Sequence, residues 1–212
     1  MTRILQSQQK PARNAAHSAA GGEKVLRQVA KEVPLPAIRT LKIKKIMKEM
    51  SVALRSQSDG VAIAAPQLGY SLRIFVVLGK ILKAEFTRRG LSEREEREKE
   101  RLASTPGRDP ASKDSAVKDL VFINPKITKL SREKEWVPEG CLSVRWLYGK
   151  THRSKKATIS AYDEQGKRFE RGASGLLAQI FQHETEHLNG ILFIDHAKEV
   201  KEELPNEQRR QK

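Results

Sequence analysis

Residues 174–190 read Ser-Gly-Leu-Leu-Ala-Gln-Ile-Phe-Gln-His-Glu-Thr-Glu-His-Leu-Asn-Gly, and we expect the rest of the domain to be built around them. Apolar residues recur here at the spacing of one helix face, which predicts an amphipathic helix over residues 175–188. Ser174 suits the N-cap of this helix, and Asn189-Gly190 suits its end. The face that we expect to be buried consists of Leu176, Leu177, Ile180 and Leu188.

Two histidines lie one turn apart on this predicted helix. His183 and His187 are four positions apart, so they share a helix face and both imidazoles can bind one metal ion. Glu184 follows the first histidine and is placed to act as a general base on a water at the metal. Two solvated histidines are the alternative interpretation. A catalytic metal site also needs a third protein ligand and an open position.

The one cysteine of the chain is a candidate for that third ligand. Cys141 lies in the segment Pro-Glu-Gly-Cys-Leu-Ser at residues 138–143. Its thiolate would complete a tetrahedral site with two histidines and a water, and the metal would lower the pKa of that water toward neutrality. A lone cysteine is more often a small buried residue than a ligand. The neighbouring Gly140 and the need for a third ligand favour the metal site.

A third segment, Gly-Val-Ala-Ile-Ala-Ala-Pro-Gln-Leu-Gly at residues 60–69, is rich in small side chains. Small residues let a backbone approach another strand or a ligand closely, and a tightly packed core strand is the alternative explanation. Gln67 interrupts the apolar run. Its amide could therefore donate a hydrogen bond to an oxyanion that develops during a reaction.

Taken in the order in which they occur along the chain, the three segments resemble the motifs of the peptide deformylase family. The first motif of that family, G-x-G-x-A-A-x-Q, is similar to residues 60–67. The second motif, E-G-C-L-S, matches residues 139–143, and the third, Q-H-E-x-x-H, matches residues 182–187. The resemblance covers residues 23–78 and 120–197.

The resemblance implies an enzyme that hydrolyses the N-formyl group of the N-terminal formylmethionine of nascent polypeptides and releases formate. It implies Glu184 as the general acid and base, and the Gln67 side chain and the Leu142 N–H as donors to the formyl oxygen. The implied metal ligands are Cys141, His183 and His187. The ion we expect is Fe²⁺, with Zn²⁺, Ni²⁺ or Co²⁺ as alternatives. The implied substrate-binding residues are Gly60, Val61, Ala62, Gly140, Leu176 and Ile180.

The chain also departs from the family pattern in three places. Ala62 stands where the family usually has its second glycine, and residues 144–148 replace a commoner continuation that contains proline. Gln179 lies near the expected pocket and would give it a polar edge. None of these departures touches an implied metal ligand or Glu184, so all three concern substrate preference. Glu139 and Arg153 match a charged pair that supports the cysteine loop in relatives.

The remaining pattern predicts an α+β fold, because strand-like segments precede one late helix. We expect a single compact domain of antiparallel or mixed β-sheets packed around the C-terminal metal-binding helix, with an N-terminal helix over residues 37–56. The expected strands lie at residues 72–78, 120–130, 157–162 and 167–171. The expected boundaries are a weakly structured tail at 1–22, a catalytic domain at 23–197 with a charged insertion at 79–119, and a charged tail or helix at 198–212.

Net charge and composition indicate which classes of partner to expect. The formal net charge of +15 favours anionic partners such as the ribosome, with plain solubility as the alternative. Aromatic residues make up only 5% of the chain and form no stacking pattern, so no sequence-specific nucleic acid is expected. No apolar stretch approaches the ~20 residues of a membrane span, so no membrane partner is expected. One cysteine suits a reducing compartment, and we expect a bacterial cytoplasm, with organelle targeting by residues 1–22 as an alternative.

Two other functions stay open at this point. One is a zincin-type metallopeptidase, which would take its third ligand from downstream of the helix, where His196 and Glu199 are available. The other is a non-catalytic basic protein that binds the ribosome or RNA. That second function would explain the charge but not the joint presence of Gln67, Cys141 and Glu184 with both histidines.

Overall fold

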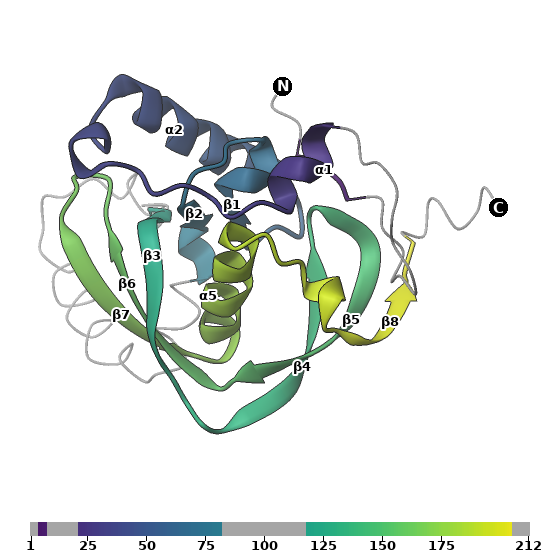
Figure 1. The fold of residues 1–212 in the computed structure, drawn as a ribbon. Helices are drawn as coiled ribbons and strands as arrows, with labels where there is room; N and C mark the ends of the chain where they lie inside the picture. Colours follow the sequence, from purple (N-terminus) through teal and green to yellow (C-terminus); the bar gives the residue numbers. More distant parts are fainter. Residues whose placement is uncertain (1–3, 8–20, 82–117, 205–212) are drawn as a thin grey trace, which may run out of the picture.

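The computed structural model describes residues 4–7, 21–81 and 118–204. These residues form one compact α+β domain, in which a central helix lies between a five-stranded and a three-stranded antiparallel sheet (Figure 1). The predicted fold class is confirmed. The helices are α1 (Gly21–Leu26), η1 (Leu35–Ala37), α2 (Leu41–Arg55), η2 (Ala65–Leu68), α5 (Gly175–Leu188) and η4 (Phe193–Asp195).

The five-stranded sheet has the order β1-β2-β3-β6-β7, and the three-stranded sheet has the order β4-β5-β8. All strand pairs are antiparallel. The strands are β1 (Ala62–Ala64), β2 (Ile74–Val77), β3 (Leu120–Leu130), β4 (Lys134–Cys141), β5 (Val144–Ser154), β6 (Lys156–Tyr162), β7 (Arg168–Ser174) and β8 (Lys198–Glu202). Four of these lie where strands were expected, and β1, β4, β5 and β8 are additional.

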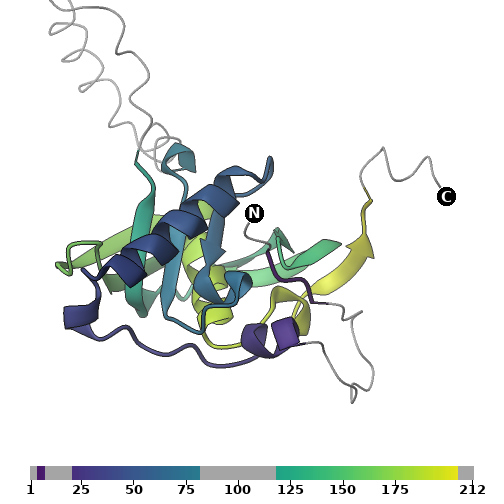
Figure 2. The same ribbon diagram turned by 90° about the horizontal axis from the view of Figure 1, so that it is seen from above.

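Strand β2 is apolar throughout because helices cover both of its faces. Successive side chains of a strand point to opposite faces of the sheet. Ile74 and Val76 pack in the cluster that contains α2, whereas Phe75 and Val77 pack in the cluster that contains α5. Figure 2 shows α2 crossing one side of this sheet. A continuous apolar run is the pattern expected of a strand buried on both faces.

Three phenylalanines join the large sheet to the central helix. The rings of Phe75 and Phe122 stack across β2 and β3 with centroids 4.4 Å apart. Phe181 of α5 meets Phe122 edge-on, with centroids 5.2 Å apart. Aromatic pairs of this geometry add to the free energy gained from burying their area. The helix that carries both histidines is therefore held on a rigid apolar base.

Helix α5 begins and ends as predicted. Ser174 is the N-cap, and Asn189 is the C-cap. Gly190 follows with φ of 75°, and a Cβ at this position would lie 2.7 Å from the backbone of Arg27, so both conformation and space require glycine. One expectation was wrong: Leu176 is 44% exposed and does not share the buried face of this helix.

Helix α2 is shorter than the predicted range 37–56, because Thr40 caps it. The Thr40 hydroxyl accepts a hydrogen bond from the N–H of Ile43, so the α-helix begins at Leu41. Leu41 is 85% exposed in this first turn. The 3₁₀ turn η1 occupies residues 35–37 ahead of the cap.

The three-stranded sheet brings the cysteine segment beside α5. Strands β4 and β5 form a hairpin whose register shifts between Gly140 and Cys141, where the chain turns through Leu142 and Ser143. Residues 198–202, expected as a tail or a helix, instead form β8, which pairs with β5. Strand β5 therefore pairs with one edge of β8, and β8 is the edge strand of this sheet.

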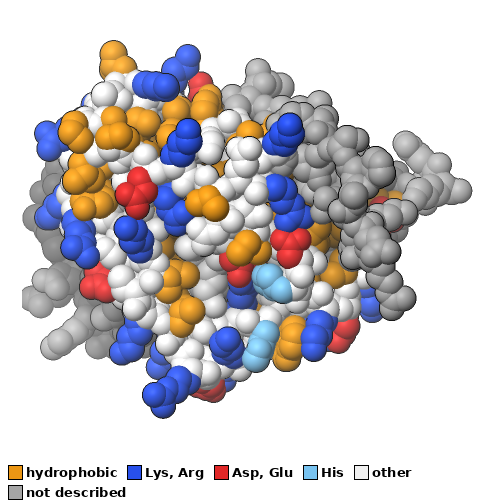
Figure 3. Space-filling model, in the orientation of Figure 1, with side chains coloured by type: hydrophobic (Ala, Val, Ile, Leu, Met, Phe, Trp, Pro, Cys, Tyr) orange, Lys and Arg blue, Asp and Glu red, His pale blue; other side chains and the backbone are white. Residues whose placement is uncertain are grey.

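Parts of the predicted tails and insertion lie outside the described residues, namely 1–3, 8–20, 82–117 and 205–212. Residues 4–7, within the segment expected to be a weakly structured tail, lie against the core, and Ile4 is buried. Basic side chains are spread across the face shown in Figure 3 and are not gathered in one patch. No helix in the described ranges is both long and apolar enough to cross a bilayer.

Candidate metal centre and active site

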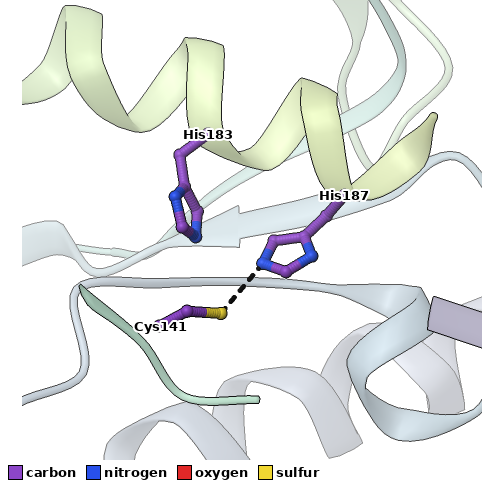
Figure 4. Close-up of side chains that lie close together, drawn as sticks. All are labelled: Cys141, His183 and His187. Carbon is purple, nitrogen blue, oxygen red and sulfur yellow. Dashed lines mark hydrogen bonds between the residues drawn. The ribbon is translucent and has the colours of Figure 1, made fainter. Parts of the chain in front are cut away.

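Three potential metal ligands converge from two elements. His183 and His187 lie one turn apart on α5, and Cys141 ends β4 (Figure 4). Their ligand atoms all lie within 4.8 Å of one another, and Sγ of Cys141 is 3.1 Å from Nε2 of His187. One thiolate and two imidazoles form a donor set that suits Zn²⁺ or Fe²⁺ and leaves a fourth position for water. The residues present therefore fit a catalytic divalent metal.

A buried carboxylate orients one of these histidines. Oε1 of Glu139 lies 2.7 Å from Nδ1 of His183, which leaves Nε2 of that ring to face the ligand cluster. Arg153 donates to the same carboxylate at 2.6 and 2.9 Å, and Thr151 donates at 2.7 Å. Burial alone would raise the pKa of Glu139, but the hydrogen bonds and charges of His183 and Arg153 hold it well below its ordinary value. Glu139 is therefore ionised at neutral pH.

The buried charge network continues to the far side of Arg153. The guanidinium also donates to Glu186 at 2.7 Å, so it lies between two carboxylates with a side chain that is 5% exposed. Burial would lower the pKa of Arg153, and hydrogen bonds to Glu139 and Glu186 raise it instead. The network joins β4, β5 and α5, the elements that carry the ligands and their support.

Glu184 is buried beside the ligand cluster. Its side chain lines the cavity, and its Oε2 has no hydrogen-bond partner among the described residues. Burial raises the pKa of Glu184 to about 7, with the positive charge of His183 opposing and the negative charge of Glu139 adding to the rise. A carboxylate that titrates near neutrality can both accept and return a proton at neutral pH.

The backbone fixes the orientation of the Gln67 side chain. The N–H of Ala64 can only donate, and it lies 2.8 Å from Oε1 of Gln67. The donating Nε2 must therefore face the other way, where it lies 3.2 Å from Oγ of Ser143 and 3.6 Å from Sγ of Cys141. Gln67 is 2% exposed. Its amide thus presents N–H groups to the site.

A cavity of about 270 Å³ opens beside these groups. Cys141, His183 and Glu184 lie on its wall together with Gln67 and Leu142. The six residues expected to bind substrate also line it, and they are Gly60, Val61, Ala62, Gly140, Leu176 and Ile180. Leu176 is exposed to this cavity because it lies on the side of α5 that faces away from the phenylalanine cluster.

The sequence did not single out several other residues of the wall. Arg145 and Trp146 line the cavity, and the guanidinium of Arg145 donates to Asp59 at 2.6 Å and to Gln57 at 2.7 Å. These bonds join the two segments on either side of the cavity. Trp146 has φ of 64°, which is uncommon for a bulky residue. The sequence feature that could have indicated Arg145 and Trp146 as cavity residues was the departure from the family pattern at residues 144–148.

Gln179 has a structural role at the cavity edge. Its Nε2 donates to the carbonyl of Pro138 at 2.9 Å and to Oε2 of Glu139 at 3.2 Å. The amide therefore ties α5 to the strand that carries Cys141.

Comparison with known proteins identifies the family to which the chain belongs. The family model described as Polypeptide deformylase matches residues 18–203. The chain belongs to the peptide deformylase family. Its members are hydrolases, so the chain is an enzyme, and the non-catalytic alternative is wrong.

Individual deformylases show how far the similarity reaches. The peptide deformylase of Fusobacterium nucleatum is 34% identical over 180 residues, which are 82% of this chain and 79% of that protein. Peptide deformylase 1A, chloroplastic/mitochondrial, of Arabidopsis thaliana is 35% identical over 177 residues; the match spans 83% of this chain but 59% of the plant protein. The structure of an Acinetobacter baumannii deformylase bound to Met-Ala-Ser has a TM-score of 0.64 and 25% identity, covering 92% of this chain and 99% of that one.

The ligands required by the metallopeptidase alternative are not at the site. His196 lies with its Nε2 3.1 Å from Glu186, and Glu199 forms an ion pair with Lys150 at 2.7 Å. In the described part of the chain, the cluster that can hold a metal ion contains Cys141 and neither of these residues.

Proposed function

We propose that this deformylase removes the formyl group from the N-terminal formylmethionine of nascent polypeptides and releases formate. The observation that carries the proposal is the convergence of Cys141, His183 and His187 next to the buried Glu184, on the wall of a cavity with an apolar edge. A divalent ion held by the three ligands would supply Lewis acidity and lower the pKa of a water in the site.

Residues of the chain itself supply proton transfer, stabilisation of the oxyanion and orientation of a metal ligand. Glu184 takes the proton from the attacking water and returns it to the departing amine, for which a pKa of about 7 is well matched. Nε2 of Gln67 and the N–H of Leu142 donate to the formyl oxygen as negative charge develops on it. Glu139 holds His183 in the orientation that directs Nε2 to the metal.

Apolar residues of the cavity are suited to a methionine side chain. Val61, Leu176 and Ile180 lie on its wall, and an unbranched thioether fills such irregular apolar space well. The Acinetobacter baumannii structure contains Met-Ala-Ser, a peptide with the free N-terminal methionine that deformylation would leave. Ala62 lines the cavity at the position where the family usually has its second glycine, so we expect selectivity between peptides to differ from that of relatives with glycine there.

The resident metal we propose is Fe²⁺, with Zn²⁺, Ni²⁺ or Co²⁺ as alternatives. Thiolate and imidazole ligands accept all four ions, so the choice depends on supply and on oxidation of the thiolate as well as on affinity. Metal analysis of protein prepared without oxygen tests this assignment.

The test of the function is the release of formate from formyl-Met-Ala-Ser by protein loaded anaerobically with Fe²⁺. Acetyl-Met-Ala-Ser is the matched control substrate, because its acyl group is larger by one methyl. We expect formate release from the formyl peptide and slow or no release of acetate. Cleavage of internal peptide bonds without formate release would contradict the proposal.

We also propose that the basic surface brings the enzyme to the ribosome, where its substrate is made. Lys and Arg side chains are spread over the face shown in Figure 3, and the net charge is +15. Such attraction weakens as salt shortens the Debye length, so co-sedimentation with ribosomes should fall across a salt series. Binding that ignores salt would contradict this mode of contact. The name of the Arabidopsis relative gives chloroplasts and mitochondria as its location. For this chain, we propose the cytoplasm of a bacterium, with targeting to an organelle as the alternative.

A further inference from the structure

The segment of residues 4–7 is bound to both halves of the proposed oxyanion site. The N–H of Leu5 donates to the carbonyl of Gln67 at 2.7 Å, and the N–H of Ser7 donates to the carbonyl of Ser143 at 2.6 Å. Between them, Nε2 of Gln6 donates to the carbonyl of Leu142 at 2.8 Å. In Figure 2 this segment is the dark purple piece near the N-terminus.

An apolar anchor holds the segment in place. Ile4 is 9% exposed and belongs to the same cluster as Leu68, which follows Gln67, and Leu142, whose carbonyl accepts the bond from Gln6. The two loops that the segment joins are far apart in sequence, at residues 65–69 and 141–143. The bridge therefore connects η2 to the turn between β4 and β5.

The side-chain amide of Gln67 makes the direct hydrogen bonds between the loop at residues 65–69 and the turn at residues 141–143, and the proposed reaction uses the same amide. Nε2 of Gln67 donates to Ser143 at 3.2 Å, and the same Nε2 is the proposed donor to the formyl oxygen. The bonds from Leu5, Gln6 and Ser7 are independent of that amide. They can hold the loops together while the Gln67 amide binds substrate.

We propose that residues 4–7 are a positioning segment, which holds Gln67 and Leu142 at the separation that lets both donate to one oxygen. This inference rests on the proposed function. The segment does not contact the substrate, because none of its residues lines the cavity. It acts on the reaction through the geometry of the two donors, and small displacements of catalytic groups have large effects on rate.

The test uses the full chain and two variants. Gln6→Leu removes one hydrogen bond to the turn at Leu142, and a chain that lacks residues 1–7 removes all three bonds. We expect kcat to fall about threefold in the first and about tenfold or more in the second, less than the roughly 10²–10³-fold loss when an oxyanion donor is removed outright. KM and the bound metal per protein should stay within about twofold of the full chain. Gln165→Leu, in an exposed turn, is the matched control and should leave kcat unchanged.

Amide hydrogen exchange provides a readout that does not depend on catalysis. We expect faster exchange at residues 60–69 and 139–145 in both variants, with exchange in α2 unchanged. If the full chain shows no deformylation, local exchange still reports whether the segment holds the loops, so the two failures can be told apart. Unchanged kcat in the chain without residues 1–7 would overturn the proposal. So would a general rise in exchange with loss of metal, because it would indicate a role in folding alone.

Discussion

Oε1 of Glu139 lies 2.7 Å from Nδ1 of His183, so a residue two positions before the cysteine orients a histidine 44 positions further along the chain. The same carboxylate accepts hydrogen bonds from Arg153 and Thr151. One acidic side chain therefore sets the relative placement of both segments that supply the proposed metal ligands. Groups that hold a metal-binding histidine in this way commonly change metal affinity by 10–100-fold when they are removed.

Glu139 should contribute stability that depends on pH. Its pKa in the folded protein is held well below the ordinary value of 4.5, so its contribution is complete above about pH 4.5 and is lost as pH falls toward the folded value. We expect Glu139→Gln to lower the melting temperature of the metal-free protein at pH 7, and the difference from the unsubstituted chain to shrink as pH falls below 4.5. A difference that stays constant down to pH 3 would contradict this linkage.

Removal of Arg153 should destabilise the domain strongly. Arg153→Met leaves Glu139 buried without its cationic partner, and breaking a buried ion pair in this way typically costs about 3–5 kcal/mol. Urea denaturation of the metal-free protein measures the change in the free energy of unfolding. The matched control is Lys155→Met. Lys155 directly follows the end of β5, and its ion pair with Glu133 is solvent-exposed and should contribute little to stability. Equal effects of the two substitutions would rule out a special role for the buried network.

Substitution of Cys141 should release the metal. Cys141→Ala removes the thiolate from the ligand cluster, so we expect much weaker binding of Zn²⁺ or Fe²⁺ in equilibrium dialysis. In the unsubstituted chain, bound metal should protect Cys141, the single cysteine, from alkylation. If the alanine variant binds metal as tightly as the parent chain, Cys141 is not a ligand.

Substitution of Glu184 should separate metal binding from turnover. Glu184→Gln keeps the size of the side chain and removes its capacity to accept a proton, so we expect kcat to fall by about 10²–10⁴-fold with full metal content. Formate release and metal analysis on the same preparation measure the two quantities. Near-normal turnover would show that another group carries the proton.

Local periodicity was enough to predict several elements. Helix α5 was predicted from Ser174 to its end at Asn189 because the N-cap, the apolar face and the closing glycine are all local signals. Strand β2 was predicted because burial on both faces leaves an unbroken apolar run. The one-turn spacing of His183 and His187 likewise follows from helix geometry alone. Their pairing with Cys141 came from the resemblance to a family, since the residues by themselves left His196 and Glu199 open as ligands.

Contacts between distant segments were decided by the tertiary structure alone. The register of β4 on β5 brings Glu139 to Arg153, and the packing of α5 against that hairpin brings Cys141 within 3.1 Å of His187. Strand β8 and the bridge of residues 4–7 carry no periodic signal, because each is short and its hydrogen bonds go to remote backbone groups. The sequence by itself determined which residues repeat on one face of a helix or strand, since neighbours along the chain are fixed by backbone geometry. Which of those faces meet around the cavity depended on strand register and helix packing, which are properties of the whole folded chain.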